Sequence, residues 1–269
     1  EPLDYILTED IYLLDYTPIS TTNIRSFDGN NKTIHILSFN TPSDQTSVNL
    51  ALFNEVLEGT TLKNIRVNVY YGGGVTSVNV AGFAISNSGI ITNCEVVSYS
   101  YVGAERPNPQ TPGLTVNYNY SNIDVSSIQS RVAGFVITNA GSITNSRVGG
   151  TSLEIANGTA ITPTAFNIIG QGDVAGFVYE NSGIIASSFF MNGTITNQTS
   201  SGSDTATAGF AITNTGEIRL SYARGIYAND SEIHATGGGI ETASVGAGFI
   251  YENSGIIEDS YSNIMLTTI

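Results

Sequence analysis

The stretch Ala81-Gly82-Phe83-Ala84-Ile85-Ser86-Asn87-Ser88-Gly89-Ile90-Ile91 decides the fold, because its pattern returns four more times along the chain. The later copies start at Ala133, Ala175, Ala208 and Ala247, and all five read A-G-F-x-x-x-N-x-G-x-I. A unit repeated in this way is typical of a solenoid, in which each unit buries its apolar face against its neighbours. The repeat therefore predicts a stacked scaffold that displays surface.

Alignment of the five copies puts an aromatic and an amide residue in fixed columns. They are Phe83, Phe135, Phe177, Phe210 and Phe249, and Asn87, Asn139, Asn181, Asn214 and Asn253. We expect the phenylalanines to form a continuous interior stack. The Asn and Gly of each copy are expected at a sharp bend, because Gly tolerates positive φ and Asn tolerates the left-handed conformation. Asn amides stacked in register can also bond to one another, which predicts an amide ladder.

A third column contains the only cysteine, Cys94, where the other copies have Ser146, Ser188, Ser221 and Ser260. A buried cysteine behaves as a small hydrophobic residue. Cys94 is therefore interpreted as a small stacking residue, with a reactive thiol as the alternative. One cysteine forms no internal disulfide, so cysteine usage does not decide the compartment.

The apolar pieces of each copy have the length of strands, not of helices. In the copy that starts at Ala175, three pieces cover 175–179, 183–190 and 193–199. About three strands per coil predict an all-β fold, a right-handed parallel β-helix. An antiparallel sandwich is the structural alternative, but it does not explain why each column keeps one residue type.

We expect a single domain over residues 1–269, since no linker with a change of composition divides the chain. Residues 1–50 are interpreted as lead-in coils and residues 51–269 as six repeat units. The first unit is degenerate and begins Ala51-Leu52-Phe53. Insertions are expected near 103–131, 151–174 and 228–246. Both ends are rich in strand formers, which suggests that this segment belongs to a larger polypeptide.

The charge balance limits the partners. Nine basic residues against 23 acidic ones give a formal net charge of −14. Nucleic acid and anionic membranes need a positive surface, so neither is expected as a partner. No run of 18 apolar residues occurs, so no membrane insertion is expected.

The chain resembles a family of bacterial surface proteins. Asp4-Tyr5-Ile6-Leu7-Thr8-Glu9-Asp10-Ile11, Pro18-Ile19 and Phe27-Asp28-Gly29-Asn30-Asn31-Lys32-Thr33-Ile34 look like the lead-in of large surface proteins. The units that follow resemble the GLUG-type repeat, although Ala-Gly-Phe stands where that repeat has Gly-Leu-Phe. The resemblance implies an adhesin segment similar to filamentous haemagglutinin-like exoproteins of the two-partner secretion route. It implies a secreted or cell-surface location and a role in cell adhesion and virulence. It supplies no catalytic residue and no cofactor.

An enzyme is the main functional alternative, because β-helices can carry paired carboxylates for acid and base catalysis. The candidate carboxylates are Glu180 and Glu252, with Glu217, Glu258 and Asp259. Glu180 and Glu252 occupy one column, two coils or about 10 Å apart, which is the far limit for an inverting glycosidase. They belong to a repeated phrase, Tyr-Glu-Asn-Ser-Gly-Ile-Ile, so a structural role explains them. His35 and His234 lack the spacing of metal ligands. A purely structural stalk is the remaining alternative.

Recognition is expected in the insertions, because loops vary more freely than stacked coils. The longest contains Arg106, Tyr118 and Tyr120 beside several prolines, and Tyr99 and Tyr101 flank it, as do Tyr70 and Tyr71. Tyrosine supplies amphipathic contact area, and proline stiffens the chain. These residues predict a site for a host or cell-surface receptor, with glycan as the first choice of ligand and protein as the second.

Overall fold

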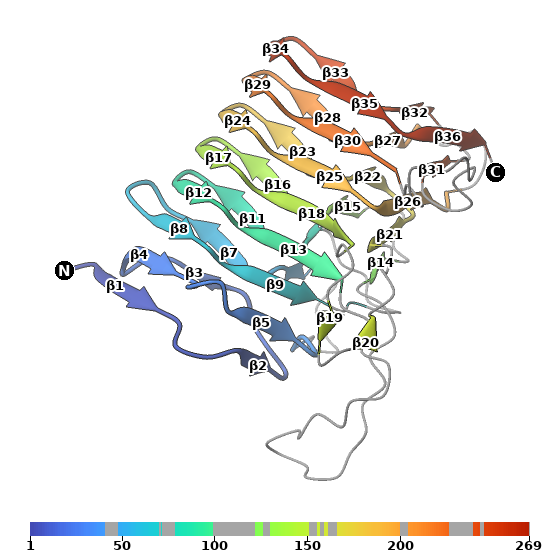
Figure 1. Ribbon diagram of the computed structural model, residues 1–269. Coiled ribbons are helices and arrows are strands. Elements are labelled where there is room, and N and C mark those ends of the chain that lie inside the picture. The colour runs from blue at the N-terminus through green and yellow to red at the C-terminus, as the bar shows by residue number, and fades with distance from the viewer. Residues whose placement is uncertain are drawn as a thin grey trace.

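The computed structural model describes residues 1–40, 48–69, 71, 79–98, 122–125, 130–150, 155–156, 159–160, 166–199, 204–225, 239–242 and 245–268. Their regular secondary structure is entirely β, and the strands of five sheets stack in parallel register from the N-terminal to the C-terminal end of the molecule (Figure 1). The predicted parallel β-helix is confirmed. These described residues include no helix of the length and hydrophobicity needed to cross a membrane.

The coil that begins at Asp173 defines the order of the five sheets, because it runs through one strand of each. The first sheet contains β6 (Asn49–Leu50), β10 (Asn79–Ala81), β15 (Arg131–Ala133), β22 (Asp173–Ala175), β27 (Ala206–Ala208) and β32 (Val245–Ala247). The second contains β3 (Ile19–Ser20), β7 (Phe53–Val56), β11 (Ala84–Asn87), β16 (Val136–Asn139), β23 (Val178–Asn181), β28 (Ala211–Asn214) and β33 (Ile250–Asn253).

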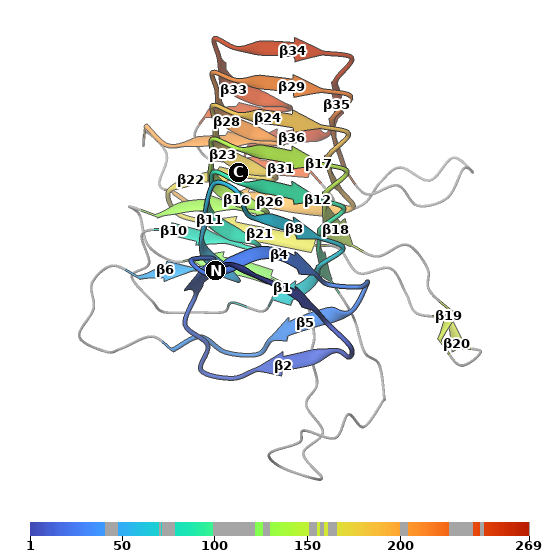
Figure 2. The ribbon, with the colours of Figure 1, turned by 90° about the vertical axis from the view of Figure 1, so that its left-hand side faces the viewer.

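The third and fourth sheets have eight strands each and begin in the lead-in coils. The third, which faces the viewer in Figure 2, contains β1 (Leu3–Ile6), β4 (Ile24–Asp28), β8 (Thr61–Lys63), β12 (Ile90–Thr92), β17 (Ser142–Thr144), β24 (Ile184–Ala186), β29 (Glu217–Arg219) and β34 (Ile256–Glu258). The fourth contains β2 (Ile11–Leu13), β5 (Thr33–Ile36), β9 (Arg66–Val69), β13 (Glu95–Ser98), β18 (Arg147–Gly150), β25 (Phe189–Met191), β30 (Tyr222–Arg224) and β35 (Tyr261–Asn263).

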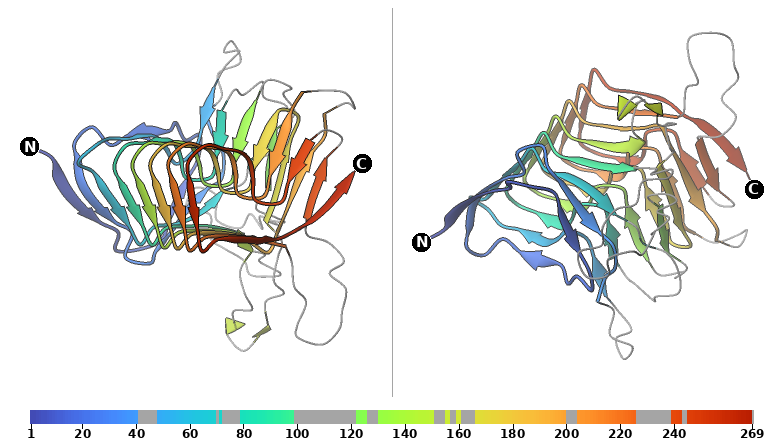
Figure 3. Two further views of the ribbon diagram at one scale, coloured as in Figure 1. Left: turned by 90° about the horizontal axis from the view of Figure 1, so that it is seen from above. Right: turned by 60° about the horizontal axis from the view of Figure 1, so that its bottom comes forward.

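The fifth sheet closes the coils and contains β14 (Asn122–Val125), β21 (Phe166–Gly170), β26 (Gly193–Asn197), β31 (Gly239–Thr242) and β36 (Met265–Thr268). A separate antiparallel pair consists of β19 (Ile155–Ala156) and β20 (Thr159–Ala160). Seen along the stack, successive coils follow the same outline (Figure 3). The predicted insertions were too wide, because β14, β21 and β31 belong to the coils.

Each coil has more and shorter strands than the three pieces expected from the sequence. A residue with positive φ separates β24 from β25 at Ser187 (φ 50°), so the expected piece 183–190 turns a corner. The same corner is occupied by Asn64, Asn93, Asn145, Leu220 and Asp259, whose φ values also fall in the left-handed region. Three of these six residues are asparagines, which tolerate this conformation.

The phenylalanine column is the centre of the interior. Phe83, Phe135, Phe177 and Phe210 are fully buried, and their rings stack with centroids 4.8 Å apart. Phe249, in the last coil, is half-buried and lies 5.0 Å from Phe210. At the other end, the ring of Phe53 lies 5.7 Å from that of Phe83, so the degenerate first unit continues the stack. The predicted interior stack is confirmed, with its last member only partly covered.

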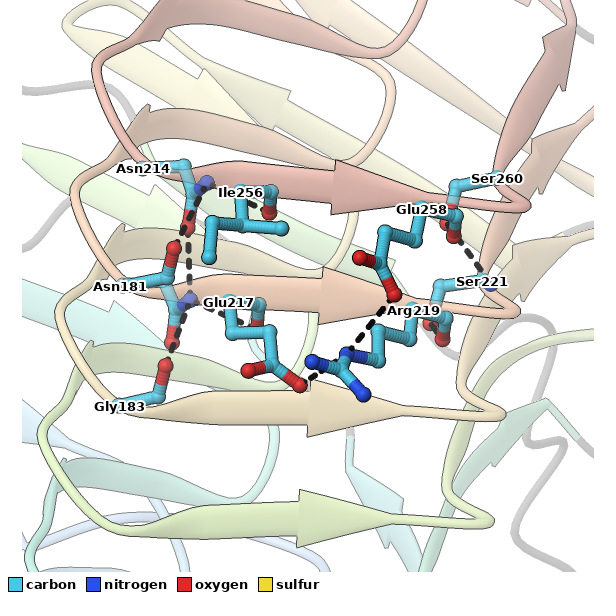
Figure 4. A network of polar contacts seen from close by, with 10 residues as sticks. Asn181, Gly183, Asn214, Glu217, Arg219, Ser221, Ile256, Glu258 and Ser260 are labelled. Carbon is cyan, nitrogen blue, oxygen red and sulfur yellow. Dashed lines mark hydrogen bonds and ion pairs between the residues drawn. The ribbon is translucent and has the colours of Figure 1, made fainter.

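The asparagine column forms the predicted amide ladder at the end of the second sheet (Figure 4). Nδ2 of each Asn donates to Oδ1 of the Asn in the next coil, and each of the four bonds, from Asn87 through Asn139, Asn181 and Asn214 to Asn253, measures 2.7 Å. The first four amides are buried, whereas Asn253 is exposed. The ladder therefore places a row of polar side chains inside the stack with their hydrogen bonds satisfied.

The expected reason for the glycines was wrong. Neither Asn87 nor Gly89 has a positive φ. The glycines are required because neighbouring coils approach closely. A Cβ atom on Gly176 would lie 2.1 Å from the carbonyl oxygen of Gly209, and one on Gly183 would lie 2.1 Å from that of Gly141. Any side chain at these positions would push the coils apart.

Cys94 occupies the small-residue column as predicted. It is fully buried, and its backbone N–H donates to Ser146 Oγ at 3.2 Å. Ser146 N–H donates in turn to Ser188 Oγ, and the same bond recurs from Ser188 to Ser221 and from Ser221 to Ser260. Burial raises the pKa of the Cys94 thiol to about 12. The structure thus keeps the sulfur protonated and covered.

Cys94 is expected to be inert in the folded chain, because the thiolate is the reactive form and burial suppresses it. A thiol reagent at pH 8 should modify it only after denaturation. Cys94→Ser should change the free energy of unfolding by no more than about 1 kcal/mol, since serine makes the same bonds in four other coils. Rapid labelling of the folded chain would contradict the burial of this column.

Candidate functional site

The three longest segments that interrupt the coils leave the scaffold at one corner, between the fourth and fifth sheets. In the coil from Asp173, the single residue Asn192 (φ 53°) joins β25 to β26 there. In three other coils the chain leaves at the same corner and returns much later: from β13 to β14, from β18 to β21 and from β30 to β31. The three predicted insertions therefore start from one edge of the stack, two of them at adjacent coils and the third two coils further on.

The residues expected to bind a receptor belong to the first of these segments. Tyr99, Tyr101, Arg106, Tyr118 and Tyr120 all lie between β13 and β14, outside the described residues. Their assignment stays a prediction. Tyr70 also lies outside the described residues. Tyr71 does not present its ring to a ligand, because it is only 6% exposed and packs against Phe39 with ring centroids 6.1 Å apart.

The carboxylates considered for catalysis lie on outer faces of the sheets. Glu180 and Glu252 flank Thr213 in the second sheet, so two strand spacings separate them as expected. Glu180 Oε1 lies 3.8 Å from Arg131 Nη1. On the third sheet, Arg219 pairs with Glu217 and, at 3.2 Å, with Glu258 (Figure 4). Glu180, Glu217 and Glu258 each form an ion pair with a neighbouring arginine, which explains these carboxylates without a catalytic role.

Arg131 also takes part in a polar cluster at the bend between the first and second sheets. Its guanidinium carbon lies 5.1 Å from the centre of the Tyr179 ring, within cation–π range. The Tyr179 hydroxyl donates to Asp173 Oδ2 at 2.8 Å. Burial and the Asp173 carboxylate raise the pKa of Tyr179, so this hydroxyl stays a donor. The cluster joins two adjacent coils and contributes to their packing.

The outer side of the fourth sheet carries an arrangement that we call the arginine–aromatic face. It consists of Arg66, Glu95, Arg147, Phe189, Tyr222 and Tyr261, which occupy one outward column on successive strands, together with Arg224. Glu95 lies between two arginines: Arg66 Nε donates to its Oε2 at 3.0 Å, and Arg147 Nη2 donates to the same oxygen at 3.1 Å. The Phe189, Tyr222 and Tyr261 rings stack at 4.7 and 5.3 Å.

The arginine–aromatic face borders the corner from which the insertions leave, since Arg224 ends β30. Sequence reasoning did not identify this face, although a signal was present. In the aligned copies, the position directly after the Cys94/serine column reads Glu95, Arg147, Phe189, Tyr222 and Tyr261. This column does not keep one residue type, so the repeat pattern does not reveal it. Alternation of inward and outward side chains along a strand places it on the surface.

Comparison of the chain with models of protein families, with curated proteins and with solved structures found no match.

Proposed function

We propose that this chain is a non-enzymatic, exported adhesin segment that uses a β-helical scaffold to hold receptor-binding loops. The observation that carries the proposal is the common corner between the fourth and fifth sheets, where three coils of the same stack each have a long insertion. A rigid scaffold that holds several variable segments on one edge is well suited to recognition, because loops can change while the coils keep their packing.

The sequence supports the same function. The A-G-F…N-x-G-x-I units resemble repeats of bacterial surface adhesins, and the net charge of −14 disfavours nucleic acid and anionic membranes as ligands. The proposed partner is a glycan or protein on the surface of a host or neighbouring cell. The proposed location is outside the cell or on the bacterial surface.

The first insertion is expected to carry receptor contacts, so replacing residues 106–119 with a short Gly-Ser turn should lower binding to cells or to a glycan array by about tenfold or more. The cut ends before β14, since Asn122–Val125 belong to the fifth sheet. Stability should change little, because loop length alters closure entropy only weakly. Binding and thermal unfolding should be measured on the same preparation.

Equivalent shortening of residues 152–164, which join β18 to β21, is the matched control. It tests whether any loss is specific to the first insertion. Unchanged binding by the folded chain that lacks residues 106–119 would place the receptor site elsewhere. Unchanged binding after both of these deletions and after equivalent shortening of the segment between β30 and β31 would contradict a role for this corner in recognition.

A further inference from the structure

The charge of the fourth sheet differs from that of the rest of the molecule. Its described strands contain three arginines, Arg66, Arg147 and Arg224, and one acidic residue, Glu95, so they carry two more positive than negative charges. The strands of the second sheet contain Glu55, Glu180 and Glu252 and no basic residue. In a chain with only nine lysines and arginines and a net charge of −14, this grouping gives the fourth sheet a local excess of positive charge.

The aromatic part of the arginine–aromatic face also favours an anionic ligand. Phe189 and Tyr222 stack with an angle of 4° between ring planes, and Tyr222 and Tyr261 with an angle of 11°. Stacking covers the ring faces between neighbours, so solvent meets ring edges and the two phenol groups. The edge of an aromatic ring is the positive part of its quadrupole. This column therefore offers positive edges and hydroxyl donors, and few open faces on which a neutral sugar could stack.

Tyr222 lies within electrostatic range of two arginines. The pKa of Tyr222 is raised by burial and by Tyr261, while Arg224 and Arg147 oppose that rise. Both arginines are thus near enough to the Tyr222 hydroxyl to act on its charge. Tyr261 is 54% exposed, and the side chains of Arg66 and Arg147 are each 27% exposed, so ligand atoms can reach this column from solvent.

The arginines recur on every second strand of the sheet. Arg66, Arg147 and Arg224 lie on β9, β18 and β30. Arg66 and Arg147 share one register column, whereas Arg224 lies two residues further along its strand. Two strand spacings are about 10 Å. A linear polysaccharide with an acidic group on every sugar or on every second sugar can place anions at a comparable period along an extended chain. Such a ligand could run parallel to the axis of the stack and meet several arginines in turn.

We propose that the arginine–aromatic face binds a linear acidic polysaccharide, with the arginines pairing with its carboxylate or sulfate groups and the tyrosines donating hydrogen bonds to it. This proposal rests on the proposed adhesin function and names a ligand class for the scaffold beside the insertions. Glu95 holds Arg66 and Arg147 in place in the free chain. An anion of the ligand then adds to, or replaces, the contacts made by the Glu95 carboxylate.

Binding should be measured by titration calorimetry with polygalacturonate, which carries carboxylates, and with heparin, which carries sulfates as well. Dextran is the neutral control, and poly-glutamate is the acidic peptide control. We expect binding to at least one acidic polysaccharide that weakens as salt rises from 50 to 300 mM, because screening reduces contacts between exposed charges. Preference between the two polysaccharides identifies the anionic group.

Three variants locate the site. The double change Arg66→Gln and Arg147→Gln should weaken binding by about tenfold or more. Arg219→Gln, which removes an arginine from the third sheet, is the matched control and should leave binding unchanged. Glu95→Gln should strengthen binding severalfold, because it removes the negative charge that competes for both arginines. A merely structural role for Glu95 would predict no such gain in affinity. If the double variant fails to fold, the affinity of the Glu95→Gln variant tests whether the ligand binds at Arg66 and Arg147.

No binding to either acidic polysaccharide would overturn the proposal, as would equal binding to poly-glutamate or an unchanged affinity in the folded double variant. The chain that lacks residues 106–119 should keep its affinity for the polysaccharide, since the face lies on strands of the fourth sheet. Failure of the loop deletion to reduce cell binding and failure of the polysaccharide to bind are therefore distinguishable results.

Discussion

Phe177→Ala should lower the free energy of unfolding by about 3 to 5 kcal/mol, the range observed when a fully buried aromatic ring is deleted from a core. Phe177 is in the middle of the ring stack, 4.8 Å from Phe135 on one side and from Phe210 on the other. Coils of a solenoid are stabilised through their nearest neighbours, so the loss weakens two interfaces. A second, lower unfolding transition should appear if the coils on either side uncouple.

Phe249→Ala is the matched control for this change. The same residue type in the same column is half-buried and has one stacked neighbour, Phe210, at 5.0 Å. Its removal should cost clearly less than that of Phe177. Denaturant unfolding of both variants, monitored by circular dichroism, makes the comparison. Equal effects at the two positions would show that the stack does not stabilise the interior.

Asn181→Asp should destabilise the folded chain by about 3 to 5 kcal/mol at pH 7, the size of an uncompensated buried charge. Asn181 accepts from Asn139 Nδ2 and donates to Asn214 Oδ1. A carboxylate can still accept the first bond, but it has no proton for the second and faces the oxygen of Asn214. Asn181→Ala should cost less, about 1 to 3 kcal/mol, since it only leaves partners unsatisfied.

The effect of Asn181→Asp should depend on pH in a defined direction. Burial and the facing amide oxygen favour the protonated acid, so its pKa in the folded chain should lie above that of the unfolded chain. The folded state then binds more protons, and the penalty grows as pH rises above about 4. Comparison with the parent at each pH isolates this effect.

The last member of the ladder provides the control for the aspartate variant. Asn253 is exposed, and its Oδ1 accepts from Asn214 Nδ2. A carboxylate can take that role in contact with water, so Asn253→Asp should be close to neutral in its effect on stability. Equal losses from Asn181→Asp and Asn253→Asp would contradict the ladder as the source of the penalty.

Residue columns made the interior of this fold predictable from the sequence. The columns of Phe177 and Asn181 keep one residue type in every copy, and that of Ser188 keeps a small residue, serine in four copies and Cys94 in one, because stacking repeats the same environment in successive coils. The left-handed corner was not predictable in the same way, because Ser187 and Leu220 occupy it beside asparagines. The corner requires a backbone in the left-handed conformation, and several residue types can adopt that conformation at a modest cost in free energy.

The fifth sheet shows a second limit of the sequence pattern. Its strands share a register column of aliphatic residues, Ile123, Ile168, Ile195, Ile240 and Leu266. Segments of different length separate most of these strands from the A-G-F copies, so a fixed repeat frame does not align them, and Asn122–Val125, Phe166–Gly170 and Gly239–Thr242 were assigned to insertions. Backbone hydrogen bonds join these strands, and such bonds do not depend on side-chain identity. The candidate receptor residues from Tyr99 to Tyr120 stay a prediction from composition, whereas the arginine–aromatic face became visible only when strand register put its members together.

Asn192 shows what the scaffold requires at the corner where the insertions leave. One residue suffices to join β25 to β26, and the coil still contributes a strand to every sheet. The coil is therefore complete without an insertion, and its neighbours do not depend on the length of one. A foreign peptide placed between β25 and β26 would sit beside the native segments with its ends already anchored, so the molecule could serve as a carrier for sequences chosen by an experimenter.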